Sequence, residues 1–194
     1  MKNKHFKIEP LNIDKFIKVN DLQGVKNPIF FDANGLPTTD GLLSNEIFGI
    51  TKDDRANIFS YIHLGANEVF MHPLHYKIWT KLDSKIRSCV HGTSTFIIKD
   101  GELVEDPNGE CGIKFLQKNF DKIKIKRTAS SRRDYSIKFL KTHKDTMFIK
   151  DMVVIPAFWR DVNSTGKYTG VGDINKIYSS LIIAAKSLPE SNDY

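Results

Sequence analysis

One stretch near the end of the chain, residues 152–188 (MVVIPAFWRDVNSTGKYTGVGDINKIYSSLIIAAKSL), constrains the fold most. Residues 152–155 are apolar and largely β-branched, and Pro156 follows them, which predicts a buried strand. Residues 157–172 hold three glycines among basic and aromatic residues, so we expect a loop that projects from the body. Asp173 is the expected N-cap of a helix. Apolar residues then recur at helical spacing at Ile174, Ile177, Tyr178, Leu181, Ile182, Ala185 and Leu188.

A second informative patch is residues 40–49, DGLLSNEIFG. It is typical of a short helical turn that packs Phe48 inward and ends at Gly49 as a C-cap. The segment DANG at residues 32–35 precedes it and indicates a turn between two apolar runs.

The rest of the chain predicts short strands and several helices. Strands are expected at residues 61–65 and in a hairpin of 93–98 with 102–105, closed by Asp100 and Gly101. Pro73 should open a helix whose buried face is Tyr76, Trp79, Leu82, Ile86 and Val90. Further helices are expected from residue 12 or 14 and over 112–124 and 135–144. The predicted class is α+β, an irregular mixed fragment with short strands, several helices and projecting loops.

Composition limits the cellular context and the kind of partner. The chain has 194 residues, enough for a single region spanning 1–194, and a net charge of +6. That charge favours a polyanionic partner, although a merely basic protein fits it equally well. No apolar run approaches the roughly 20 residues of a membrane helix, and no signal peptide is visible. Two cysteines fit a reducing compartment, so a cytoplasmic location is expected.

Metal binding is not predicted for this chain. His72 and His75 are three residues apart, and His63 and His91 are the other histidines near them. Zinc sites normally show two clear pairs of ligands, and no CxxC pair exists here. Ordinary surface or core histidines are the favoured interpretation.

The most basic run is residues 122–133, KIKIKRTASSRR. Such runs are usually solvated loops, and phosphate contact is the competing interpretation. The cationic candidates for phosphate contact are Lys124, Lys126, Arg127, Arg132 and Arg133.

Two of these patches resemble the largest, β′-type subunit of multisubunit DNA-directed RNA polymerases. Residues 154–156 (VIP), Arg160 and residues 173–178 (DINKIY) are similar to the family's lid, where a V-[IL]-P strand end and an arginine precede D-[IL]-N-x-[IL]-Y. Residues 40–49 are similar to the zipper pattern D-G-L-x-x-x-x-I-F-G. Asp161 replaces the second proline of the lid pattern. Around residues 62–64 and Pro73 the similarity is looser.

The resemblance implies a non-catalytic N-terminal clamp region, zipper-like over 28–49 and lid-like over 150–188. The 173–188 helix would begin a coiled coil that docks a promoter-specificity factor; the sequence stops first, which fits a split subunit or a truncated chain. The four-cysteine zinc ribbon of cellular relatives is missing, as in the split-subunit polymerases of large bacteriophages. Implied partners are β-like subunits, the remainder of β′, DNA template and the RNA–DNA hybrid, in a host cytoplasm or a virion.

The lid-like loop supplies the other candidate contacts to nucleic acid. Phe158, Trp159 and Tyr168 are candidates to stack on an unpaired base, while Arg160 and Lys167 are candidates to neutralise phosphates. Phe158 and Trp159 would alternatively anchor the loop in a neighbouring subunit.

Catalytic motifs are absent from the sequence. The aspartate triad that holds Mg²⁺ in these polymerases has no D-x-D-x-D counterpart, so Mg²⁺ is expected on another segment or subunit. No Walker A, G-x-S-x-G or H-E-x-x-H motif occurs. We therefore expect a chain that holds nucleic acid without doing chemistry. Two alternatives remain open: a stand-alone basic nucleic-acid-binding protein, and a structural assembly module.

Overall fold

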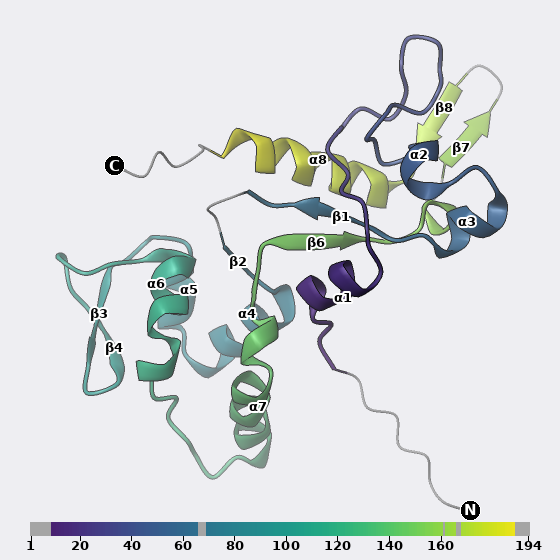
Figure 1. The fold of residues 1–194 in the computed structure, drawn as a ribbon. Coiled ribbons are helices and arrows are strands. Elements are labelled where there is room, and N and C mark those ends of the chain that lie inside the picture. The colour runs from purple at the N-terminus through teal and green to yellow at the C-terminus, as the bar shows by residue number, and fades with distance from the viewer. Residues whose placement is uncertain (1–8, 66–68, 161, 166–167, 189–194) are drawn as a thin grey trace, which may run out of the picture. The chain divides into compact units, whose positions relative to one another are not determined.

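The chain forms two compact units, each assembled from segments distant in sequence (Figure 1). The computed structural model describes residues 9–65, 69–160, 162–165 and 168–188. Unit 1 comprises Met1–Asn12 and Val69–Ile149, and unit 2 comprises Ile13–Glu68 and Lys150–Tyr194. Helices and short antiparallel strands in small sheets give an irregular α+β fold, as the sequence predicts.

Unit 2 holds the segments on which the resemblance rests. Its elements are α1 (Ile13–Val19), α2 (Asn45–Phe48), α3 (Lys52–Asn57), β1 (Ser60–His63), β6 (Asp151–Val154), η3 (Ala157–Trp159), β7 (Val162–Thr165), β8 (Tyr168–Val171) and α8 (Asp173–Ser187). Strands β1 and β6 pair antiparallel, with Ser60 opposite Val154 and His63 opposite Asp151. Strands β7 and β8 form a second antiparallel pair between β6 and α8 in the chain.

The interior of unit 2 is small and mainly aliphatic. Its fully or nearly covered apolar side chains include Val25, Leu42, Leu43, Ile47, Phe48, Ile62, Leu64, Val154, Ala157 and Ile182. Burial of this apolar area is the main favourable term for folding, and it draws residues 25–64 and 154–182 into one core.

Unit 1 consists mainly of helices. Its elements are β2 (Phe70–Met71), α4 (Pro73–Leu82), α5 (Lys85–Val90), β3 (Phe96–Lys99), β4 (Glu102–Glu105), α6 (Gly112–Asn119), η1 (Phe120–Lys122), α7 (Ser131–Thr142), η2 (Lys144–Thr146) and β5 (Phe148–Ile149). Its core surrounds Trp79, whose ring meets Phe120 edge-on with centroids 5.2 Å apart.

Several predicted elements are confirmed where local chemistry is strong. Strand β6 ends before Pro156, and Pro73 opens α4 in its first turn. Gly49 caps α2 at φ 73°, a left-handed conformation that favours glycine. In the β3–β4 hairpin, Asp100 and Gly101 both have positive φ, as a two-residue hairpin turn requires.

The predicted buried face of α8 needs correction. Ile177 is 66% exposed and Ile174 36% exposed, whereas Asn175 and Ile182 are buried. Apolar residues occur on more than one side of this helix, so periodicity alone does not choose the inward side. The helix also begins one residue earlier than predicted: Gly172 is the N-cap and Asp173 is the first helical residue.

The helix predicted from Pro73 to Val90 is divided in two. The chain leaves α4 at Asp83, which is extended, and re-enters helix at Lys85. Trp79 and Ile86 are nevertheless both buried in the same core. No helix in the described ranges is long and apolar enough to span a membrane.

Candidate nucleic-acid interface

Arg160 is buried within unit 2, with 1% of its surface exposed. Its guanidinium donates from Nε to the Ile155 carbonyl at 2.9 Å and from Nη2 to the Leu42 carbonyl at 2.6 Å. The third donor, Nη1, reaches Oδ1 of Asn175 at 2.7 Å. The guanidinium carbon also lies 4.7 Å from the centre of the Phe48 ring. Arg160 therefore joins the end of β6, the start of α8 and residues 42–48.

Tyr178 adds a second link between α8 and β6. Its hydroxyl donates to the Val153 carbonyl at 3.3 Å and accepts from the Ile155 backbone N–H at 3.5 Å. Val153 lies within β6, which pairs with β1 on one side only, and Ile155 follows the end of the strand, so the tyrosine hydroxyl supplies these two backbone groups with a partner. The arginine, asparagine and tyrosine of the lid-like pattern thus form hydrogen bonds inside unit 2 that link the end of β6 to α8.

This geometry corrects the expected role of Arg160. We predicted a phosphate contact, but the guanidinium is covered and its donors are used inside the unit. Burial lowers the pKa of Arg160 to about 10, although the nearby Tyr178 acts to raise it. The side chain remains protonated at neutral pH, and its charge is stabilised by carbonyl dipoles and the face of Phe48.

Phe158 and Trp159 present an aromatic surface on unit 2. They are 45% and 64% exposed, and their rings meet edge-on with centroids 5.2 Å apart. The Trp159 indole N–H donates to the Ala56 carbonyl at 3.0 Å, and Lys52 lies 5.2 Å from the Phe158 ring centre. Both rings are held in place while their outer surfaces stay open, a geometry suited to stacking or to anchoring a partner.

The structure does not describe the side chains of two predicted contact residues in the lid-like loop, Lys167 and Tyr168. Lys167 lies outside the described residues. Tyr168 begins β8 opposite Thr165, and the structure describes its backbone position only.

The basic run of residues 122–133 divides into a loop and the first turn of α7. Lys124, Lys126, Arg127 and Arg132 are exposed. Lys126 pairs with Glu102 at 2.9 Å and Arg127 with Asp134 at 3.5 Å, both in solvent, where such pairs contribute little stability. These cations remain accessible to an external phosphate.

Arg133 differs from its neighbours in the run. It donates from Nε to the Lys126 carbonyl at 2.6 Å and from Nη2 to the Leu82 carbonyl at 2.9 Å. It is only partly exposed. Arg133 therefore links the basic loop to the end of α4, a structural role that the sequence did not predict.

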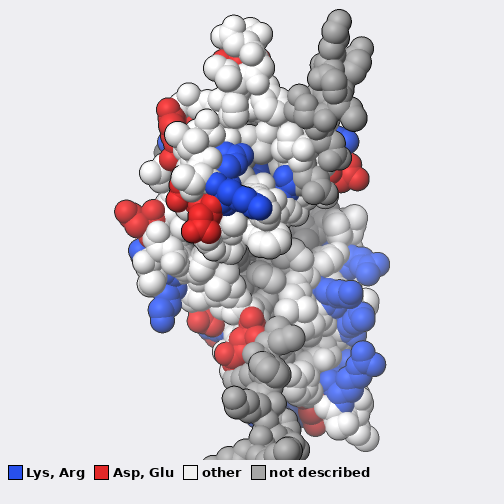
Figure 2. Space-filling model, turned by 90° about the vertical axis from the view of Figure 1, so that its right-hand side faces the viewer, with Lys and Arg blue, Asp and Glu red and all other residues white. Residues whose placement is uncertain are grey.

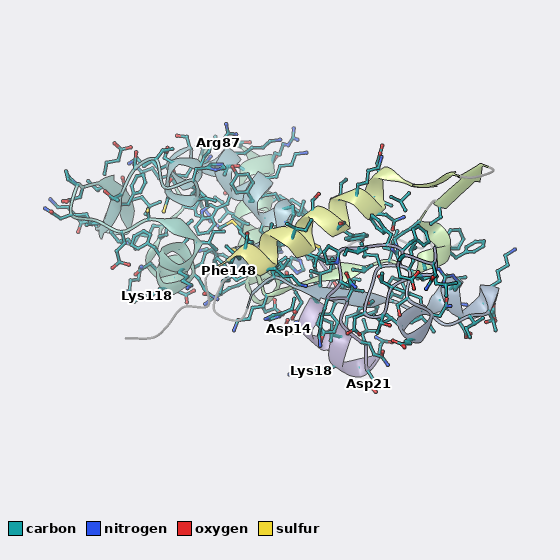
Figure 3. The ribbon with its side chains drawn as sticks, turned by 90° about the horizontal axis from the view of Figure 1, so that it is seen from above. Asp14, Lys18, Asp21, Arg87, Lys118 and Phe148 are labelled. Atoms are coloured by element: carbon teal, nitrogen blue, oxygen red, sulfur yellow. The ribbon has the colours of Figure 1, made fainter. Side chains whose placement is uncertain are left out.

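Positive charge is unevenly spread over the surface. Several Lys and Arg side chains lie next to one another along one edge of the face in Figure 2, while acidic side chains are mixed with basic ones elsewhere on it. In unit 1, Arg87 on α5 and Lys118 on α6 lie on opposite sides in Figure 3, so cations are not confined to a single face.

Residues that sequence reasoning missed lie on α7. Tyr135 is 71% exposed, and Lys138 and Lys141 are exposed at three-residue steps after it. Their three-residue spacing, which places them on one side of a helix, is the sequence signal that could have identified them. Lys52, which lies over Phe158, had no local signal because the two are more than 100 residues apart.

The described residues offer no obvious chemistry. No group of three or more His, Cys, Asp or Glu side chains in the described ranges is arranged to hold a metal ion. His63 and Asp151 form a 2.7 Å pair across β1 and β6, with His63 half exposed, but no nucleophilic side chain is hydrogen-bonded to that pair among the described residues. The candidate residues thus give an exposed aromatic surface on unit 2 and an exposed basic surface on unit 1.

Comparison with known proteins gives no family assignment. The chain matches no protein-family model and none of the curated proteins.

Proposed function

We propose that this chain is the N-terminal, non-catalytic part of a β′-like subunit of a multisubunit DNA-dependent RNA polymerase. It would contribute clamp, zipper and lid elements that hold DNA and the RNA–DNA hybrid during transcription. The partners would be β-like subunits, the remainder of β′ and a promoter-specificity factor. The type with split subunits, as in large bacteriophages, fits best because no zinc ribbon follows the zipper-like patch.

One observation carries the proposal. The zipper-like and lid-like patches, which were identified separately in the sequence, meet at Arg160 through Leu42, Phe48, Ile155 and Asn175. Leu42 and Arg160 are 118 residues apart in the chain. Chance matches to two motifs would have no reason to converge, whereas motifs inherited from one folded region would.

Two further features support the proposal. The β7–β8 hairpin lies between β6 and α8 in the chain, at the position that the lid would occupy. The exposed Phe158 and Trp159 at its base suit either base stacking or contact with a neighbouring subunit. On the zipper side, α2 is followed at once by α3, so the chain continues without an inserted ribbon.

A pull-down tests the assembly. A tagged copy of the chain, expressed in its native context, should recover β-like subunits and a partner that carries the missing aspartate triad. The isolated chain with template, NTPs and Mg²⁺ should incorporate no nucleotide. Recovery of the chain alone would overturn the polymerase proposal.

A deletion tests the lid role in the assembled enzyme. Removing residues 163–170 and closing with glycines should change stability little, since loop closure varies by only about 0.6 kcal/mol per doubling of length. The enzyme should still start synthesis but leave over-long RNA–DNA hybrids that ribonuclease H digests. A Gly-Ser segment of the same length is the matched control, because it separates the hairpin's side chains from its length. Hybrids of normal length would count against the lid.

A stand-alone nucleic-acid-binding protein is the second candidate. The exposed cations of the loop before α7 favour it, because they belong to unit 1 and do not depend on the lid-like segment. A chain that purifies alone and yet binds DNA with strong salt dependence would support this candidate.

A further inference from the structure

Unit 1 carries a groove between residues 120–127 and α7. Two hollows of about 420 and 510 Å³ lie along it, and both are lined by Arg127, Ile137 and Lys141. The first extends past Tyr135 and Lys138, and the second continues to residues 120–125 and Lys144. The two hollows adjoin at these three shared residues and follow one another along the helix; together they are hereafter called the α7 groove.

The α7 groove is strongly cationic. Its basic lining residues are Lys124, Arg127, Lys138, Lys141 and Lys144, and its acidic ones are Asp121 and Asp134. Both acids are already paired, Asp121 with Lys144 and Asp134 with Arg127. Among the ion pairs of the described residues none involves Lys124, Lys138 or Lys141, so their charge is available to an anion.

The apolar part of the groove decides which polyanion fits. Its apolar lining includes Phe120, Ile123 and Ile137, which are 7%, 8% and 2% exposed, and the half-buried Ile125, so the aliphatic surface open to an acidic peptide is mainly that of Ile125. The most exposed residue with a large apolar side chain in the groove is Tyr135, which is 71% exposed. A flat, exposed aromatic ring beside cations suits a nucleobase and its phosphates better than it suits a peptide.

The spacing along α7 also suits a strand of nucleic acid. Tyr135, Lys138 and Lys141 follow at three-residue steps, about 4.5 Å apart along the axis, on one side of the helix. We propose that the α7 groove binds single-stranded nucleic acid, with a base stacked on Tyr135 and the phosphates neutralised by Lys138, Lys141 and Lys124. A duplex keeps its bases paired and stacked inside, so it would offer Tyr135 no base face.

This inference goes beyond the polymerase proposal and does not rest on it. All the lining residues belong to unit 1, whereas the lid-like and zipper-like patches belong to unit 2. The two proposals can therefore be tested independently. Failure to bind single-stranded nucleic acid would contradict the groove proposal only. Recovery of the chain without partners would contradict the polymerase proposal only.

The test measures binding by the full purified chain. Fluorescence anisotropy with a labelled twelve-residue oligo(dT) should show binding that weakens with salt. The double variant Lys138→Ala/Lys141→Ala should bind at least about tenfold more weakly at low salt and lose about 1.4 from its log–log salt slope, at roughly 0.7 per single-strand contact. Tyr135→Ala should weaken binding about tenfold while leaving the salt slope unchanged.

The matched control removes the same charge elsewhere in unit 1. Lys77 and Lys81 are exposed on α4 and do not line the groove, so Lys77→Ala/Lys81→Ala should bind as the unchanged chain does. All the substituted residues are exposed, and circular dichroism should show every variant folded.

Four results would overturn the proposal. One is no binding of the oligonucleotide, and another is an equal loss in the control and groove variants. A third is equal affinity for a duplex of the same length. The last is full competition by polyglutamate together with unchanged binding by Tyr135→Ala, which would assign the groove to an acidic polypeptide.

Discussion

Arg160 donates a 2.7 Å hydrogen bond to Oδ1 of Asn175, and both side chains are buried. The contact fastens the segment after β6 to the first turn of α8, on either side of the β7–β8 hairpin. The two ends of the hairpin segment are therefore fixed together by side chains, and the hairpin can vary in sequence without loosening its base.

Replacing Arg160 by lysine should destabilise unit 2 strongly. A lysine ammonium cannot match the planar fork that reaches three oxygens, so at least one of Leu42 O, Ile155 O and Asn175 Oδ1 would be left without its donor. The expected loss is about 2–3 kcal/mol in the free energy of unfolding, measured by urea denaturation. Arg132→Lys, on the surface, is the control and should change it by less than about 0.5 kcal/mol. A matching small effect at Arg160 would show that the buried contacts contribute nothing net.

Arg132 and Arg133 are adjacent, yet alanine substitution should destabilise the protein at Arg133 and have almost no effect at Arg132. Arg133→Ala removes the donors to Lys126 O and Leu82 O and should cost about 1–3 kcal/mol of unfolding free energy. Arg132→Ala removes only an exposed side chain and should cost almost nothing. Protease sensitivity of the loop at residues 123–130 provides a second measurement. Equal stability of the two variants would contradict the structural role of Arg133.

His75 should make the protein lose stability in mild acid. The ring is fully buried, its Nε2 lies 3.1 Å from the His143 carbonyl and donates to it, and Nδ1 has no partner. Burial, with a further contribution from His72, lowers its pKa to about 4. The unfolded chain protonates near pH 6.5 and the folded one does not, so stability should fall from about pH 6.5 down to about pH 4, by up to about 3 kcal/mol.

The variant His75→Gln isolates that titration. Glutamine retains an N–H donor for the His143 carbonyl but does not titrate. Its unfolding free energy, measured by urea denaturation at each pH, should vary less between pH 6.5 and 4 than that of the unchanged chain. Identical slopes would assign the acid sensitivity to other groups.

Alanine substitutions at Gly49 and Gly35 should distinguish the cost of backbone strain from the cost of steric overlap. Both have left-handed φ, 73° and 76°. A Cβ at Gly49 would lie 2.3 Å from Cβ of Asp54, whereas one at Gly35 would meet no atom within 4 Å. Gly35→Ala should therefore cost about 1 kcal/mol from strain alone, and Gly49→Ala clearly more, as measured by thermal unfolding. Similar costs would mean that α3 moves aside without penalty.

Local sequence determined those helices and strands whose end residues, such as proline or glycine, restrict or permit particular backbone conformations. Pro73 has no N–H to donate and a fixed φ, so it opens α4 whatever packs on it. Asp100 and Gly101 tolerate left-handed backbone and so close the β3–β4 hairpin. Gly49 likewise ends α2 because glycine tolerates its positive φ, and the apolar, β-branched run at residues 152–155 likewise predicts strand β6.

Tertiary structure alone decided what the polar residues do. An arginine in a glycine-rich basic loop predicts a surface role, yet Arg160 is buried because carbonyls from Leu42 and Ile155 need donors there. The inward side of α8 follows from the same contact, since Asn175 must face Arg160 and Ile177 is thereby turned outward. The Leu42 carbonyl is 118 residues from Arg160 in the chain, and short-range patterns carry no information about which distant oxygen will lack a partner.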